Sequence, residues 1–224
     1  MKISIVRYFK LIKQHWKNTW HNKAFKGSLI LGLIALGAIA IFTYYFFDYI
    51  ENTKGGVVMN DWVLRILPAK DVSIPIVLFE LSVIILFLIR CLPSPTLVIT
   101  FLIAYLFILI SRDITIGITQ LRPPLGIIEL KDPVAGLVYR ASSINRDLFY
   151  SGHISLLFLF YLCSEKKTDK YYILFAVISV AICLLIQHVH YTVDVVCAPF
   201  FAYSCYWLAK KVLHFSPKVI VANV

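Results

Sequence analysis

Six long apolar segments restrict what this chain can fold into. Within a few residues, they cover 27–49, 73–89, 95–111, 149–163, 171–188 and 192–209. Each is roughly 15–23 residues long, against the ~20 that a helix needs to cross a bilayer. The chain of 224 residues is 60% hydrophobic and 15% charged, which is too apolar for a soluble domain. We therefore expect an all-α, polytopic membrane protein built as a six-transmembrane-helix bundle.

The rest of the chain divides around this membrane domain, which we place at 27–212. A basic segment over 1–26 precedes it and a short tail over 213–224 follows. Seven Lys and Arg residues cover the first segment and no small-residue cleavage site follows, so it does not resemble a secretory signal. Its lysines alternate with apolar residues and two tryptophans, which favours an amphipathic helix on an anionic leaflet over a solvated tail.

The distribution of charge predicts the orientation in the membrane. With the amino terminus in the cytoplasm, 14 of the 22 Lys and Arg residues fall on the cytoplasmic side, against two acids. The other side then holds eight against nine acids. This asymmetry follows the positive-inside rule and places both termini in the cytoplasm. It also explains the net charge of +10 without a nucleic-acid partner.

Two histidine motifs lie at the ends of apolar segments. The first is Tyr150-Ser151-Gly152-His153, and the second, His190-Tyr191-Thr192-Val193-Asp194, starts 37 residues after His153. In the predicted topology both motifs reach the same non-cytoplasmic face, so we expect one site. Polar residues at the membrane interface are the alternative, but two histidines with an aspartate are costly to place there without a function.

These residue types suit phosphoryl transfer. On a helix His190 and Asp194, at i and i+4, would share one side, and the carboxylate would accept a hydrogen bond from one ring nitrogen. The other nitrogen would then be free to attack phosphorus. His153 would protonate the leaving oxygen. Backbone amides near Ser151 and Gly152, at the start of a helix, would approach phosphate oxygens.

Two charged residues outside these motifs are further candidates. Arg122, which precedes Pro123-Pro124, would neutralise a phosphate unless it is merely a solvated loop residue. Asp147 would orient His153 or bind a cationic headgroup, or have neither role. The polar stretch from Arg112 to Asp147 that holds these candidates is expected to be an ordered loop, with Pro133 and Gly136 within it.

Aromatic and buried polar residues leave more alternatives open. Tyr150 and Tyr191 would bind a quaternary ammonium headgroup, or belong to an interfacial aromatic belt. His188 would support His190, cap a helix or lie at the membrane interface. Glu80, inside the second apolar segment, either lines the site or pairs with an arginine.

The sequence does not predict a metal or another cofactor. Its five cysteines form no CxxC or metal-spaced set and are interpreted as small packing residues. It also lacks a carboxylate-rich set suited to Mg²⁺.

The segments 147–153 and 190–195 resemble the two signature blocks of sphingomyelin synthases, within the type 2 phosphatidic acid phosphatase superfamily. The resemblance spans roughly residues 60–209. It implies a six-helix bundle that acts on phospholipids at the non-cytoplasmic leaflet. It also implies that His190 is the nucleophile, that Asp194 orients it, and that His153 is the general acid.

Departures from the superfamily pattern favour a transferase. Hydrolytic members carry a lysine seven residues before an Arg-Pro, where this chain has Thr115, and a Ser-Arg pair where it has Cys183 and Leu184. Losing two cations disfavours a phosphate monoester more than a zwitterionic phosphodiester. We therefore expect a phospholipid donor, such as phosphatidylcholine or phosphatidylethanolamine, and a lipid hydroxyl acceptor such as ceramide. The alternatives are a phosphatase that uses water, and a non-catalytic membrane protein that handles lipids.

Overall fold

The computed structural model describes residues 5–53, 55–131 and 145–215, and these parts of the chain contain helices and no strand. The helices are α1 (Ile5–Trp20), α2 (Lys23–Asn52), α3 (Trp62–Ile66), α4 (Ser73–Cys91), α5 (Pro95–Thr119), α7 (Gly152–Cys163), α8 (Lys167–Ile186) and α9 (Thr192–Phe215). Pro133 and Gly136 of the predicted loop lie outside the described residues, as does most of the predicted tail.

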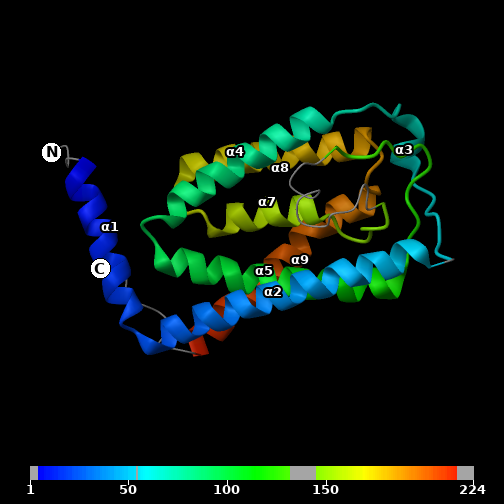
Figure 1. Cartoon of the computed structure of the whole chain (residues 1–224). Coiled ribbons are helices and arrows are strands. Elements are labelled where there is room, and N and C mark those ends of the chain that lie inside the picture. The colour runs from blue at the N-terminus through cyan, green and yellow to red at the C-terminus, as the bar shows by residue number, and fades with distance from the viewer. Residues whose placement is uncertain (1–4, 54, 132–144, 216–224) are drawn as a thin grey trace.

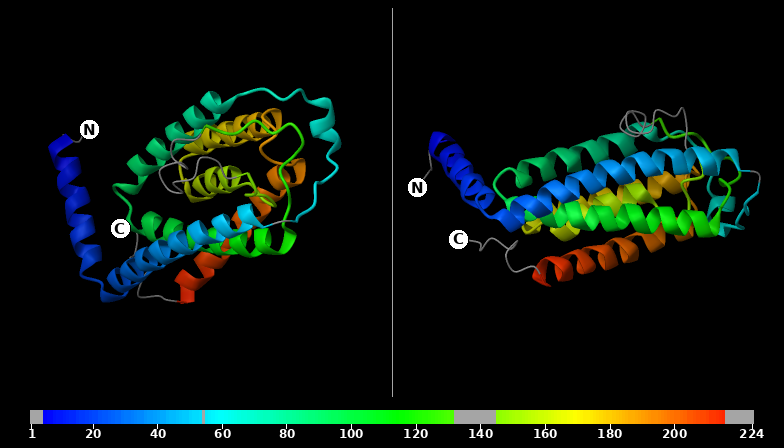
Figure 2. Two further views of the ribbon diagram at one scale, coloured as in Figure 1. Left: turned by 45° about the vertical axis from the view of Figure 1, so that its right-hand side comes forward. Right: turned by 60° about the horizontal axis from the view of Figure 1, so that its bottom comes forward.

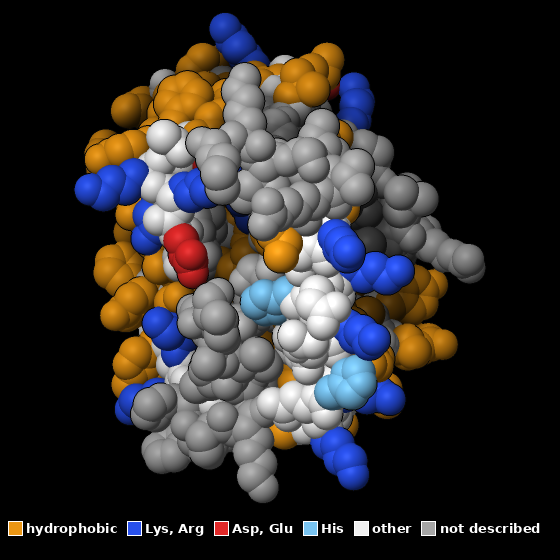
Figure 3. All heavy atoms as spheres, turned by 90° about the vertical axis from the view of Figure 1, so that its left-hand side faces the viewer, with side chains coloured by type: hydrophobic (Ala, Val, Ile, Leu, Met, Phe, Trp, Pro, Cys, Tyr) orange, Lys and Arg blue, Asp and Glu red, His pale blue; other side chains and the backbone are white. Residues whose placement is uncertain are grey.

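The long helices lie side by side and run between two ends of the bundle (Figures 1 and 2). At one end α2, α5 and α8 finish and α4, α7 and α9 begin; because both histidine motifs lie there, we call it the site end. The opposite end, which α1 crosses, is called the basic end. Lys and Arg side chains predominate over acidic ones on its visible surface (Figure 3).

Five of the helices are long and apolar enough to cross a membrane, namely α2, α4, α5, α8 and α9. Large apolar side chains such as Leu31, Ile74 and Phe200 are 68–75% exposed on their outer faces. Since such surface requires an apolar solvent, the protein is an integral, multi-pass membrane protein. The prediction of an all-helical polytopic fold is confirmed for the described residues.

The segment predicted as the fourth span is too short to cross a bilayer as a helix. It corresponds to α7, whose 12 residues extend about 18 Å at 1.5 Å per residue, against the ~30 Å of a bilayer core. α7 packs against α4, α5, α8 and α9, and most of its side chains are half-buried or buried. A short helix is tolerated in this position because its neighbours, rather than lipid, surround it (Figure 2).

The prediction that a loop begins at Arg112 is wrong, because α5 continues to Thr119. The polar pair Arg112 and Asp113 ends the apolar run, but both side chains point into the protein and are only 6–7% exposed. Asp113 accepts a hydrogen bond of 2.8 Å from Thr43 of α2. Internal partners therefore let the helix carry charge beyond the point where hydropathy predicts its end.

Local sequence signals explain where several helices begin. Asn22 caps α2 by accepting hydrogen bonds from the amides of Ala24 and Phe25. Ser94 caps α5, whose first residue is Pro95, a residue that fits the start of a helix because it lacks an amide hydrogen. Ser151 caps α7 through the amide of Ile154, so the first histidine motif starts a helix, as the sequence predicts.

The basic end is held by aromatic and apolar contacts. The indole nitrogen of Trp16 in α1 donates a 2.6 Å hydrogen bond to the carbonyl of Leu92, between α4 and α5. Lysine ammonium groups lie 3.7–5.5 Å from the ring centroids of Tyr161, Tyr206 and Trp207. Such cation–aromatic pairs, with an apolar stem and a solvated charge, are typical of a membrane interface.

Candidate active site

His190 and Asp194 meet across a turn rather than along a helix. Because α9 begins at Thr192, His190 precedes the helix and Asp194 lies in its first turn. The carboxylate folds back, so that its Oδ2 lies 3.4 Å from His190 Nδ1 and accepts a 3.0 Å hydrogen bond from the amide of Tyr191. Both side chains are almost completely buried. This arrangement directs the carboxylate at one nitrogen of the ring. The predicted cause, an i and i+4 spacing along one helix, is wrong, because His190 lies before the start of α9.

The second oxygen of Asp194 is also buried. Oδ1 has no hydrogen-bond partner among the described residues, whereas Oδ2 has two. The amino-terminal end of α9 favours a negative charge at this position, because the helix dipole is positive there. The carboxylate is therefore fixed through Oδ2, and the buried Oδ1 keeps its capacity to accept a hydrogen bond.

His153 lies opposite His190, in the first turn of α7. The centroids of the two rings are 6.2 Å apart and their planes meet at 69°. Reacting atoms in a productive complex lie about 3–3.5 Å apart, so a single phosphoryl group can lie within reach of both rings. The structure thus brings together His153, His190 and Asp194.

Glu80 of α4 is the residue that faces His153 from the other side. Its Oε1 lies 3.8 Å from His153 Nε2, and the two side chains are 11% and 20% exposed. Glu80 therefore lies beside His153, where a carboxylate that lines the site would lie. Two pairs of a histidine and a carboxylate therefore lie next to each other, one from α4 and α7 and one around the start of α9.

The backbone ties the two motifs together. The amide of Ser151 donates a 3.1 Å hydrogen bond to the carbonyl of Asp194, which joins the start of α7 to the start of α9. A residue with positive φ precedes each motif, Phe149 at 129° and His188 at 56°. Such conformations are strained for residues with side chains and persist only where neighbouring contacts hold them. The motifs are therefore fixed relative to each other by main-chain geometry.

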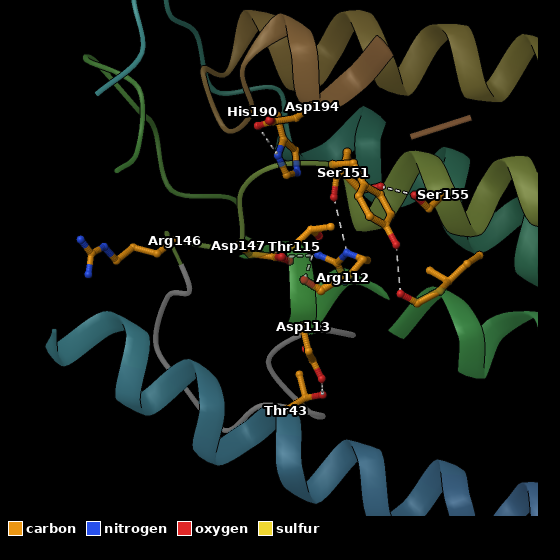
Figure 4. A network of polar contacts seen from close by, with 12 residues as sticks. Thr43, Arg112, Asp113, Thr115, Arg146, Asp147, Ser151, Ser155, His190 and Asp194 are labelled. Atoms are coloured by element: carbon orange, nitrogen blue, oxygen red, sulfur yellow. Dashed lines mark hydrogen bonds and ion pairs between the residues drawn. The ribbon is translucent and has the colours of Figure 1, made fainter. Parts of the chain in front are cut away.

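Arg112 of α5 also belongs to this region, although it lies outside both histidine motifs. Its guanidinium lies against Gly152, since a Cβ at that position would be 2.7–2.9 Å from its atoms. It forms an ion pair with Asp147, and its Nε donates a 3.4 Å hydrogen bond to the carbonyl of Tyr150. Figure 4 shows Arg112 extending from α5 towards the segment that carries Asp147 and Ser151. The only signal for it in the sequence was an arginine at the end of an apolar segment.

The other predicted binding residues are engaged with the protein itself. Arg122 is exposed and donates a 2.9 Å hydrogen bond to the carbonyl of Gly55. The hydroxyl of Tyr191 lies between the amide of Met59 and the carbonyl of Arg122, at 3.1 and 2.9 Å. These contacts fasten the loop after α2 and the loop after α5 to the second histidine motif.

Tyr150 and His188 are likewise held inside the protein. The hydroxyl of Tyr150 donates a 3.0 Å hydrogen bond to the carbonyl of Ile108, and its ring stacks on Phe201. The ring nitrogens of His188 lie 3.1 and 3.0 Å from the carbonyl oxygens of Leu125 and Leu67, which bridges two loops. Holding two loops together differs from each of the roles predicted for His188 from the sequence.

Asp61 is a second anchor that the sequence did not reveal. Its carboxylate accepts hydrogen bonds from the amide and the hydroxyl of Thr192, at 2.6 and 3.0 Å, and from the amides of Val63 and Leu64. Burial opposes the ionised form of Asp61, but these hydrogen bonds outweigh it and lower its pKa. One carboxylate therefore caps α3 and the start of α9.

No group of three or more His, Cys, Asp and Glu side chains among the described residues is arranged to hold a metal ion. The polar groups available in the described part of the site are two imidazoles, three carboxylates and the guanidinium of Arg112. They can bind an anion, deliver a nucleophile and move a proton.

Comparison with known proteins agrees with this chemistry. A family model described as PAP2 superfamily C-terminal matches residues 146–211, a range that contains both histidine motifs. The match supports the predicted relation to the type 2 phosphatidic acid phosphatase superfamily, whose members are phosphatases and phosphotransferases. Neither the curated proteins nor the solved structures gave a match.

Proposed function

We propose that this protein is a phospholipid headgroup transferase that works through a histidine nucleophile at the site end, as sphingomyelin synthases do. The observation that carries this proposal is the pairing of two histidines, 6.2 Å apart, each with its own carboxylate. One pair suits a nucleophile held in a fixed tautomer, and the other suits an acid and base beside it.

In the first half of the reaction, Nε2 of His190 attacks the phosphorus of a phospholipid such as phosphatidylcholine. Asp194 accepts the hydrogen bond from Nδ1–H and stabilises the charge that develops on the ring. The bond from phosphorus to the glycerol oxygen breaks, and His153 gives that oxygen its proton. Diacylglycerol leaves, and the phosphorylated headgroup remains on His190.

In the second half, a hydroxyl of an acceptor lipid, ceramide or a similar molecule, replaces diacylglycerol. His153, now deprotonated, removes the hydroxyl proton while the oxygen attacks phosphorus. The P–N bond breaks and returns its electron pair to His190. Glu80 supports both steps, because its charge stabilises the protonated form of His153, which is present before the first half and forms again in the second.

The charges around the site support a zwitterionic substrate. Glu80, Asp147 and Asp194 are acidic, and Arg112 is the cation in contact with the start of α7. A phosphodiester adds one negative charge, and a choline or ethanolamine headgroup brings a positive one. A phosphate monoester adds up to two negative charges and no positive one, so repulsion disfavours it more strongly.

The rival function is a lipid phosphate phosphatase, in which water is the acceptor. The family match favours it as much as the transferase, since the superfamily includes both. The same residues would act in the same order, with His153 activating water in the second half.

Purified protein in vesicles with headgroup-labelled phosphatidylcholine or phosphatidylethanolamine tests the choice. We expect a new labelled lipid only when an acceptor lipid such as ceramide is present, and none with His190→Ala. His15→Ala, at the basic end, is the matched control and keeps the activity. Release of free phosphate from phosphatidate, without headgroup transfer, would show that the protein is a phosphatase and not a transferase.

We also propose that the site end faces the non-cytoplasmic side. The Lys-rich surface and the lysine–aromatic pairs of the basic end support this orientation, by the positive-inside rule. A cysteine introduced at Leu125, which is 80% exposed in a site-end loop, should react with an impermeant maleimide on intact cells. Labelling only after lysis would show that the site end faces the cytoplasm, which contradicts the proposed orientation.

A further inference from the structure

The position of Arg112 explains why residue 152 is a glycine. Gly152 has helical geometry at the start of α7, and its φ does not lie in the left-handed region. Backbone freedom is therefore not the reason for a glycine here. The space that a Cβ would occupy is instead filled by the guanidinium, with three of its atoms 2.7–2.9 Å away.

This position places the guanidinium where the substrate phosphate is expected. Gly152 is adjacent to His153, and a phosphoryl group in reach of both histidine rings lies beside the first turn of α7. The guanidinium is planar and donates hydrogen bonds in a fork that matches two phosphate oxygens. Arg112 is 6% exposed, so its charge is little weakened by water.

Asp147 reduces this positive charge on the other side. Its carboxylate forms the ion pair with Arg112, and its side chain is 27% exposed. The lysine of hydrolytic relatives corresponds to Thr115, one turn further along α5, whose hydroxyl bonds to the carbonyls of Ser111 and Arg112. The cation at this position is therefore Arg112, and a carboxylate faces it.

We propose that Asp147, through its ion pair with Arg112, shifts the preference of the site from doubly charged phosphate monoesters towards singly charged phosphodiesters. Arg112 binds the non-bridging phosphate oxygens, and Asp147 sets the charge that the pair offers to them. A phosphodiester is attracted by Arg112 and only weakly repelled by Asp147. A monoester, with two negative charges, is attracted by Arg112 and repelled by Asp147 about twice as strongly, so Asp147 cancels about twice as much of its attraction to Arg112. The inference rests on the proposed function in placing the phosphate between the two histidines.

Ligand binding tests this selection without any turnover. In a His190→Ala background, reconstituted in nanodiscs at pH 8, dissociation constants are measured for two probes, dodecylphosphocholine and dodecyl phosphate. We expect Asp147→Asn to lower the dissociation constant of dodecyl phosphate about tenfold and to change that of dodecylphosphocholine by less than about threefold. Asp71→Asn is the matched control, since Asp71 pairs with exposed Lys131 at the same end, and it should change neither.

Changes at Arg112 show whether Asp147 acts through it. Arg112→Gln should weaken both probes by about 10–100-fold, and Gly152→Ala should act in the same direction by displacing the guanidinium. In the Arg112→Gln background the effect of Asp147→Asn should become clearly smaller, because the ion pair no longer holds Asp147 beside the phosphate. Arg112→Lys keeps the charge but loses the paired hydrogen bonds of the guanidinium, so its affinities should be intermediate. It takes the place of Arg112→Gln in these measurements if the latter variant does not fold.

The inference is wrong if Asp147→Asn changes both probes equally, or has the same effect with and without Arg112. Either result would mean that Asp147 acts on the headgroup or on His153 directly. The proposed function fails separately, when the wild-type protein transfers no headgroup to any acceptor lipid. The binding result remains interpretable in that case, because it does not depend on catalysis.

Discussion

The two ends of the bundle are stabilised in different ways. At the site end, side chains bind the backbone of distant segments: Gln187 contacts Val72, Ser73, Ile128 and Glu129. At the basic end, lysines lie over aromatic rings, and the ion pair of Arg90 and Asp169 is formed by an arginine that is 35% exposed. Buried hydrogen bonds fix loops in one geometry, whereas interfacial contacts tolerate movement.

This difference follows from what each end has to do. Phosphoryl transfer needs two histidines held at a fixed separation, and a displacement of 1 Å is enough to slow such a reaction strongly. Loops without regular structure therefore need many specific anchors at the site end. The basic end needs only to remain at a membrane surface, which charge and aromatic area achieve without exact positions.

The largest effect should come from the nucleophile pair. Asp194→Asn removes the charge beside His190 and should lower headgroup turnover by about 10³-fold or more, as loss of a residue that acts as a unit with the nucleophile does. Thermal unfolding measured alongside should change little, because Asn preserves the shape. Turnover within about tenfold of the wild type would show that the two ends do not differ in chemistry as proposed.

Glu80→Gln is expected to have the next largest effect. Loss of the charge that supports His153 should lower turnover about 10–100-fold, part of what general acid catalysis contributes. With p-nitrophenyl phosphocholine, whose leaving group needs no proton, the loss should fall below about threefold. An equal loss with both substrates would assign Glu80 to the structure of the bundle instead of to proton transfer.

Gln187→Leu tests whether side-chain hydrogen bonds stabilise the site end more than the basic end. The change removes the hydrogen bonds that tie segments 72–73 and 128–129 to Gln187, which should lower the free energy of unfolding by about 1–3 kcal/mol. Gln14→Leu in α1, where an exposed glutamine bonds to Asn18, should change it by less than about 0.5 kcal/mol. Thermal unfolding in the same detergent compares the two, and similar values would remove the distinction between the ends.

The smallest effect should be seen at the ion pair of the basic end. Arg90→Gln should lower the free energy of unfolding by about 1 kcal/mol and leave turnover unchanged, because water partly screens an arginine that is 35% exposed. A loss of activity beyond about threefold would reveal coupling between the two ends.

The sequence predicted the parts of this structure that follow from composition and topology. Apolar length identified the spans, and the parity of helices brought His153 and His190 to one end. The sequence predicted a fourth span over 149–163, whereas α7 covers only Gly152–Cys163. Composition did not reveal that α7 is enclosed by other helices, because an enclosed helix and one that crosses lipid are equally apolar. The roles of His153, His190 and Asp194 remain predictions.

The sequence also failed where charge is buried. Arg112 and Asp113 resemble the end of a span by hydropathy, since pairing with Asp147 and Thr43 depends on segments far along the chain. For the same reason Asp61 and Gln187 carried no signal, as their partners belong to other loops. Periodicity along one segment predicts its own helix, but not which distant backbone groups a side chain will bind.

Identification of the phosphorylated residue tests the central claim most directly. His153→Ala should still form the covalent intermediate from p-nitrophenyl phosphocholine but resolve it slowly, so the headgroup accumulates on the protein. After an alkaline quench, which preserves phosphohistidine, mass spectrometry of peptides should locate phosphocholine on His190. Phosphocholine on another residue, or none on any peptide while p-nitrophenol is released, would contradict a histidine nucleophile at position 190.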